Sequence, residues 1–136
     1  MVALPREFIA ALAGRDELLV SSREGATERT VPVWFVVAPP GVVYLFNYSF
    51  ALRVRRWRSD PWVRLRIPGT SVSTEGRVRF IDPSELIDVG PLVVERWGMW
   101  GATTEEGLRQ MILDGSHVLV RVEGLNPPPA QKSTQK

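Results

Sequence analysis

The pattern of hydrophobic and polar positions predicts a chain made mainly of short β-strands. Runs of β-branched and aromatic residues are separated by turns that contain glycine or proline. We expect strands over residues 17–22, 29–38, 42–46, 62–67, 71–81 and 117–122. Because the intervening turns are short, an antiparallel sheet is the economical arrangement, and closing it into a small barrel would hide its edges.

Other segments carry the signals of short helices. We expect them over residues 5–14, 82–97 and 103–113. Gly90-Pro91 lies inside the second of these and should break or kink it, because proline lacks the N–H group of the helix ladder. The sequence therefore predicts a mainly β protein, a six-stranded antiparallel barrel with small flanking helices.

Two residues inside predicted strands carry further information. Pro32 cannot donate a ladder hydrogen bond, so this point should be a sheet edge, a bulge or the entry of the strand. Bulges are frequent next to sites where a ligand meets the backbone. Gly76 indicates a bend or a close approach of another backbone segment.

Length and composition favour one ordinary globular domain. The chain has 136 residues, a hydrophobic content of 44% and a net charge of only +2. We assign residues 1–125 to this domain and residues 126–136, which are proline-rich and polar, to a disordered tail. The absence of cysteine excludes a disulfide framework and thiol chemistry.

The sequence also bears on localisation. It contains no apolar run long enough to cross a bilayer, so we expect no membrane partner. The first residues lack the basic region and long apolar core of a signal peptide and are expected to form a helix instead. We therefore predict a cytoplasmic protein.

Positive charge is concentrated in residues 47–67. Ser49 is expected to cap a short helix there, which Asp60-Pro61 ends. Arginine forks and the free N–H groups of a helix N-terminus both bind phosphate, so the segment is a candidate phosphate site. A solvated basic face is an equally good interpretation. The arginines concerned are Arg53, Arg55, Arg56, Arg58, Arg64 and Arg66.

Arginines interleaved with Trp57 and Trp62 also raise the possibility of single-stranded nucleic acid, whose bases stack on aromatic rings. Both tryptophans equally suit a hydrophobic core, and the charge of the whole molecule is small. We therefore expect no nucleic-acid partner.

The residue types needed for self-sufficient catalysis are missing. The single histidine, His117, has no cysteine to work with, and the acidic residues lack the spacing of metal ligands. We therefore predict no catalytic residue and no metal site. Any chemistry would have to come from a bound cofactor.

Several segments, taken in order, resemble one family. Residues 24–36 (EGATERTVPVWFV), 44–49 (YLFNYS), 53–65 (RVRRWRSDPWVRL) and 75–81 (EGRVRFI) look like the pyridoxamine-5'-phosphate-oxidase-like flavin split-barrel superfamily. The similarity extends over most of residues 7–123. It implies a six-stranded split barrel that forms a homodimer and binds a cofactor in the groove between the protomers.

The resemblance also implies a set of cofactor-binding residues. Arg53 falls where the family commonly has a phosphate-binding lysine, and Arg55 and Arg56 could assist it. Tyr48 and Ser49 lie at the strand end that helps to hold the phosphoribityl arm. The backbone that would line the flavin-type ring belongs to Thr30, Val31, Pro32 and Val33.

The function implied is that of a flavin- or deazaflavin-dependent oxidoreductase, with hydride or two-electron transfer to a small molecule. The cofactor would be FMN or the deazaflavin coenzyme (F-420 type), and six arginines around one turn suit the longer anionic tail of the deazaflavin. The alternative is a non-enzymatic split barrel that carries a flavin, haem or another tetrapyrrole.

Residues 47–50 (NYSF) are bulkier than the small and hydroxyl residues usual in this family, which would narrow the groove. The hairpin between Gly25 and Pro32 is also longer than the common pattern. The aromatic cluster of Trp97, Met99 and Trp100 should be costly to expose. It could fold over one end of the barrel within its own chain, but we predict that it forms part of the dimer interface.

Overall fold

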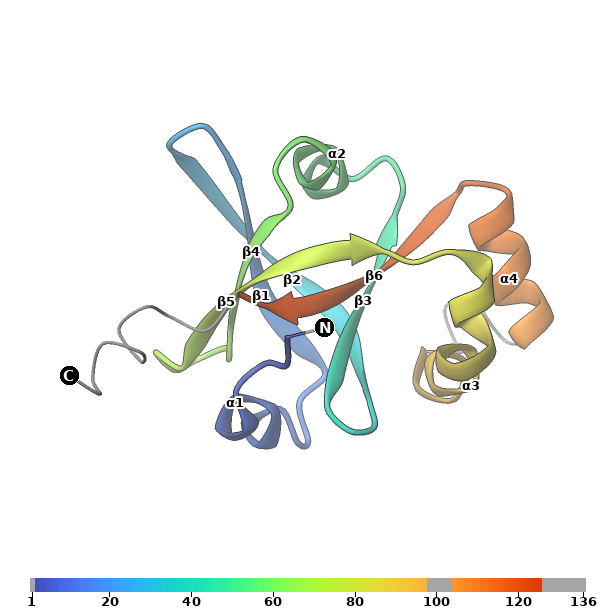
Figure 1. The fold of residues 1–136 in the computed structure, drawn as a ribbon, viewed down its shortest axis with the longest axis horizontal. Helices are drawn as coiled ribbons and strands as arrows, with labels where there is room; N and C mark the ends of the chain where they lie inside the picture. The colour runs from blue at the N-terminus through green and yellow to red at the C-terminus, as the bar shows by residue number, and fades with distance from the viewer. Residues whose placement is uncertain (1, 98–103, 126–136) are drawn as a thin grey trace.

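A computed structural model of the chain describes residues 2–97 and 104–125 and contains a closed antiparallel barrel of six strands (Figure 1). The barrel order is β1-β2-β3-β6-β5-β4, and pairing of β1 with β4 closes it. The strands are β1 Glu17–Glu24, β2 Thr27–Ala38, β3 Val42–Tyr48, β4 Trp62–Arg66, β5 Ser73–Phe80 and β6 His117–Gly124. The predicted six-stranded antiparallel barrel is therefore confirmed.

The described helices are short and lie around the barrel. They are α1 Arg6–Ala11, α2 Leu52–Ser59, the 3-10 turn η1 Pro83–Glu85, α3 Leu86–Trp97 and α4 Glu105–Leu113. In Figure 1, α1 and α2 lie at opposite sides of the barrel, while α3 and α4 lie together beside it. The predicted tail, Met99 and Trp100 lie outside the described residues, and the side chain of Trp97 is likewise not described.

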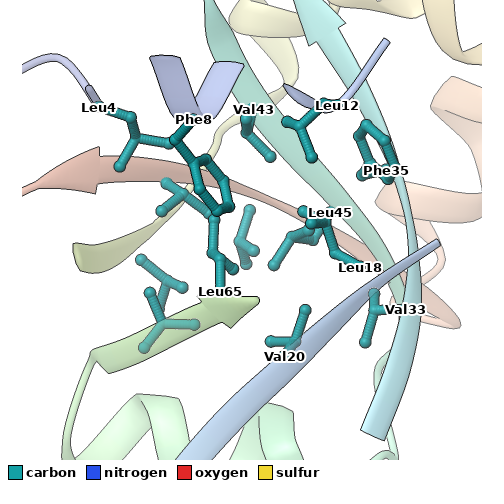
Figure 2. Close-up of a cluster of buried hydrophobic side chains, with 14 of the residues drawn as sticks. Leu4, Phe8, Leu12, Leu18, Val20, Val33, Phe35, Val43, Leu45 and Leu65 are labelled. Carbon is teal, nitrogen blue, oxygen red and sulfur yellow. The ribbon is translucent and has the colours of Figure 1, made fainter. Parts of the chain in front are cut away.

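The main core fills the inside of the barrel. Inward side chains of the strands meet Phe8 of α1 and Trp57 of α2, which are both almost completely buried. Figure 2 shows this cluster, in which Leu4, Phe8 and Leu12 lie over the strand side chains. The labelled strand residues are Leu18, Val20, Val33, Phe35, Val43, Leu45 and Leu65. Trp57 is thus a core residue.

A second core lies on the outer face of the barrel. Val36, Tyr44 and Leu119 point outward from their strands and pack against α3 and α4, chiefly against Val93 and Leu108. These strands are consequently apolar on both faces. This packing explains why the predicted break at Gly90-Pro91 does not occur: α3 runs through Pro91, which lies exposed, while Val89 and Val93 stay buried.

The predicted helix start at Ser49 is wrong. The helix begins at Leu52, its N-cap is Ala51, and no side chain caps it. The backbone N–H of Ser49 instead donates to the carbonyl of Ser116 at 3.0 Å, which continues the pairing of β3 with the segment before β6. The predicted helix end at Asp60 is confirmed.

The barrel opens on one side between β2 and β3. The two strands pair only over Phe35–Ala38 and Val42–Leu45. Beyond that point, the remaining part of β2 pairs with β1 alone among the described strands, and β3 continues along β6. Pro32, opposite Leu19 of β1, therefore lies on a free edge, as one of the three sequence-based alternatives predicted.

Candidate functional site

A cleft occupies the place where β2 and β3 separate. If the ladder continued, Trp34, Val33 and Pro32 would pair with the last three residues of β3, but a hollow lies between them instead. The missing N–H of Pro32 removes one donor from any such ladder. The cleft has a volume of about 160 Å³ and is lined by Pro32, Val33, Trp34, Phe46, Asn47, Tyr48, Arg53 and His117.

Arg53 supplies the positive charge of the cleft. It is the second residue of α2 and is half-buried. Its Nε donates a 2.8 Å hydrogen bond to Oδ1 of Asn47, and it forms no ion pair with any residue that the structure describes. Burial lowers the pKa of Arg53 from its ordinary value, yet a guanidinium remains protonated at neutral pH. A partly desolvated cation therefore faces the cleft with N–H donors to spare.

Asn47 holds this arginine in place. Its side chain is only 2% exposed, and its Nδ2 donates to the carbonyls of Leu45 at 3.0 Å and Val118 at 3.4 Å. These two bonds fix the orientation of the amide, so that Oδ1 is presented to Arg53. Because the amide is neutral, it positions the guanidinium without cancelling its charge.

Aromatic rings form another part of the cleft wall. His117 opens β6 opposite Tyr48, and its ring stacks on Phe46 with centroids 5.1 Å apart and an interplanar angle of 9°. The ring of Tyr48 lies 4.7 Å from that of His117 and stacks in turn on Phe50. Burial lowers the pKa of His117, so the imidazole is neutral at pH 7. This wall suits a flat, largely apolar ligand.

The structure brings together four of the predicted site residues: Pro32, Val33, Tyr48 and Arg53 line the cleft. Thr30 and Val31 lie on the same free edge of β2, outside the lining, and the Thr30 hydroxyl shares a 2.7 Å hydrogen bond with Ser21. Ser49 follows Tyr48, and its described contact is the backbone bond to Ser116.

Arg55 and Arg56 line a different groove, between α2 and the β1–β2 hairpin. Arg56 donates to the Ser22 hydroxyl at 3.3 Å and lies 3.8 Å from a carboxylate oxygen of Glu24. Arg55 and Arg56 therefore lie away from the cleft that Arg53 lines, although Arg56 is only one helical turn from Arg53.

The remaining arginines of the basic segment also lie away from the cleft. Arg58 covers the ring of Phe80 at 4.3 Å, and Arg64 forms ion pairs with Glu28 and Glu75. Arg66 donates to the carbonyl of Thr70. Of the six arginines, Arg53 alone is among the residues that line the cleft. The charge cluster seen along the sequence is therefore dispersed in space.

Sequence reasoning did not assign Trp34, Phe46, Asn47 or His117 to the site. Trp34 and Phe46 follow the predicted strand pattern, which carries no sign of where two strands part. His117 reaches the cleft because β6 pairs with β3, and this pairing joins residues far apart in the sequence. A polar Asn47 at the end of an apolar strand was the one local signal that could have been used.

Two further properties bear on the site. Within residues 2–97 and 104–125, no group of three or more histidines, cysteines or acidic residues is arranged to hold a metal ion. The described helices are all too short or too polar to span a membrane.

No family model and no curated protein matches the sequence, but solved structures match the fold. The heme storage protein HutZ from Vibrio cholerae superposes with a TM-score of 0.65 at 16% identity, over 93% of both chains. A proposed pyridoxamine 5'-phosphate oxidase from Listeria innocua gives 0.60 at 15% identity, covering 85% of this chain and 89% of the other. This chain has the split-barrel fold of these two proteins. The split barrel implied by the sequence resemblance is thus confirmed.

A third similar structure is a FAD-binding protein from Mesorhizobium loti, with a TM-score of 0.58 at 14% identity. It covers 90% of this chain and 91% of its own. At such identities the shared fold is the finding, and the ligands of these split barrels differ among themselves.

Proposed function

We propose that this chain binds a flavin-type cofactor, FMN or the deazaflavin coenzyme, in the cleft between β2 and β3 and acts as an oxidoreductase. The observation that carries the proposal is Arg53, a half-buried cation without an ion pair among the described residues, beside a wall of aromatic rings. An anionic group on a flat aromatic molecule complements both features.

The residues of the cleft fit the two parts of such a cofactor. Arg53, oriented by Asn47, would hold the phosphate through its free N–H groups. The backbone of Pro32 and Val33 pairs with no strand on the cleft side among those described, so it would face the polar edge of the ring. Thr30 and Val31 would extend this edge. Tyr48 and Ser49 would lie along the arm between ring and phosphate.

A bound flavin or deazaflavin would supply hydride or two-electron transfer to the substrate. The part of this chain would be to bind and orient the cofactor and to exclude water from one of its faces. In this proposal no residue of the chain is given an acid–base role in the transfer itself. Arg55 and Arg56 would contribute only to a long anionic tail that reached around α2 to their groove.

We also propose that a second copy of the chain completes the site. A volume of about 160 Å³ is small for a cofactor cleft, since ligand sites commonly measure about 300–1,000 Å³. Apolar side chains are exposed around the opening: Val31 is 37% exposed, Tyr48 52% and Phe50 75%. Burying them against a symmetry-related copy would both close the cleft and remove this surface from water.

A non-enzymatic role is the second candidate, in which the chain carries a flavin, haem or another tetrapyrrole. Two observations favour it. HutZ, which shares the fold, is a heme storage protein, and the only histidine of the chain lies in the cleft wall. Imidazole is a common haem ligand.

Titration separates these proposals. The purified protein is titrated with FMN, the deazaflavin coenzyme and haem, with absorbance and calorimetry as readouts and light scattering to give the mass. Saturable binding of either flavin with a dimeric mass supports the main proposal. A Soret shift with haem, together with no flavin binding, supports the second candidate. A monomeric mass at micromolar concentration contradicts the proposed dimer.

A further inference from the structure

The contacts of the Ser116 hydroxyl favour the tautomer of His117 that carries its proton on Nδ1. The Ser116 hydroxyl lies 2.8 Å from Nδ1 of His117 and 3.2 Å from the backbone oxygen of Met111. A carbonyl can only accept, so the single hydroxyl proton of Ser116 is directed to Met111. The bond to His117 must then be donated by Nδ1–H. In the neutral imidazole this leaves Nε2 unprotonated, with its lone pair available.

The lone pair of Nε2 has no hydrogen-bond partner among the described residues. The ring that carries it lines the cleft and is in contact with the rings of Phe46 and Tyr48. The ring is only partly buried, so water can reach this acceptor, and a donor from the molecule that fills the cleft would take the place of that water.

Burial lowers the pKa of His117 and so favours its neutral form. Arg53 on α2 lines the same cleft and is a cation that opposes a second positive charge. Tyr48 on β3 is in contact with the ring. At the end of α4, Asp114 is hydrogen-bonded to Gln110. Trp34, Val33 and Pro32 of β2 bring no titratable group to the cleft.

We propose that the cleft recognises a hydrogen-bond donor as well as an anion: Arg53 takes the anionic group, and Nε2 of His117 accepts a hydrogen bond from an O–H or N–H group of the same molecule. This inference rests on the proposed function, because a ribityl phosphate arm presents hydroxyl groups next to its phosphate. His117 is then a specificity residue for a hydroxylated phosphate ester.

The first test needs no ligand. Nitrogen-15 NMR of the free protein reports the tautomer of its single histidine directly. We expect Nδ1 to be protonated and Nε2 to be bare at pH 8. A spectrum of the Nε2–H tautomer overturns the inference even if a flavin binds.

The second test compares FMN binding by the wild type, His117→Phe and His117→Gln. Phenylalanine keeps the stacking and removes the lone pair, whereas the glutamine amide oxygen can replace the acceptor. We expect His117→Phe to bind FMN about 3- to 10-fold more weakly, the effect of one neutral hydrogen bond, and His117→Gln to recover part of this loss.

The pH dependence adds a readout that loss of packing would not reproduce. Protonation of the FMN phosphate weakens binding by both proteins at low pH. Wild-type affinity should fall more steeply than that of His117→Phe, because only the wild type also protonates His117, whose pKa is lowered by burial. Tighter binding at low pH would overturn the inference, because His117 would then act as a second cation.

The outcomes of the binding test remain distinguishable. Equal FMN affinities of the wild type and His117→Phe overturn the inference and leave the proposed function standing. If neither FMN nor the deazaflavin coenzyme binds the wild type, the proposed function fails and the inference fails with it.

Discussion

Nε of Arg53 and Oδ1 of Asn47 are joined by a 2.8 Å hydrogen bond at the point where β2 and β3 separate. The amide is buried and is itself fixed by bonds to the backbone of Leu45 and Val118. Arg53 thus lies at the start of α2 and lines the cleft together with the free edge of β2. Asn47 of β3 sets the orientation of its guanidinium. The first two predictions concern this pair.

Replacing Arg53 by alanine should weaken FMN or deazaflavin binding by about ten- to a hundred-fold, because a charge-assisted hydrogen bond contributes about 1.5–3 kcal/mol. Isothermal calorimetry of the folded variant measures this. The matched control is Arg58→Ala, which removes the same charge from an exposed site on the same helix. Equal losses for the two variants would show that α2 offers only a diffuse basic surface.

Replacing Asn47 by aspartate should lower the affinity for an anionic cofactor by about tenfold or more. The new carboxylate would neutralise Arg53 and could no longer donate to the carbonyls of Leu45 and Val118. Leaving these acceptors without a donor should also cost about 1–3 kcal/mol of stability. Calorimetry and urea unfolding measure the two effects. Unchanged affinity would mean that Arg53 does not bind the anion.

Replacing Gly76 by alanine should destabilise the barrel by about 1–3 kcal/mol, the usual cost of overpacking. A Cβ at this position would lie 2.4 Å from the backbone oxygen of Glu123 on β6, so one of the two strands must move. Denaturant unfolding measures the loss. Ser73→Ala, at an exposed position of the same strand, should stay within about 0.5 kcal/mol of the wild type.

Tyr44 should remain protonated to unusually high pH. Burial, followed by its 2.9 Å hydrogen bond to Glu85, raises its pKa to about 12. Its pKa is about 10 in the unfolded chain, so its contribution to stability is complete below pH 10 and is lost as the pH rises towards 12. Absorbance of the phenolate measures this titration.

The variant Tyr44→Phe tests the same assignment. At pH 7 it should cost about 1 kcal/mol, because Glu85 loses one donor but keeps Arg121. Its disadvantage relative to the wild type should shrink between pH 10 and 12. If the late phenolate signal persists in Tyr44→Phe, it belongs to Tyr48, the other tyrosine of the chain.

The local part of the fold could be predicted from the sequence. In a strand, side chains two residues apart lie on the same face of the sheet. The inward-facing positions of β5, including Gly76, could therefore be predicted from the alternation of residue types along the sequence. Pro32 was expected at an edge, a bulge or the entry of the strand, because its missing N–H is a property of the residue itself. The helix stop at Asp60 followed from similarly local chemistry.

The composition of the site depended on tertiary structure. Arg53, Arg55 and Arg56 are close neighbours in the sequence, yet α2 directs Arg53 to the cleft and the other two to another groove. His117 joins Tyr48 only because β6 pairs with β3. Such pairing depends on contacts between segments that are distant in the chain. The residues next to a given position therefore do not predict which strand will pair with it. The sequence alone therefore determined which strands would form, while their pairing around the barrel decided which side chains share the cleft.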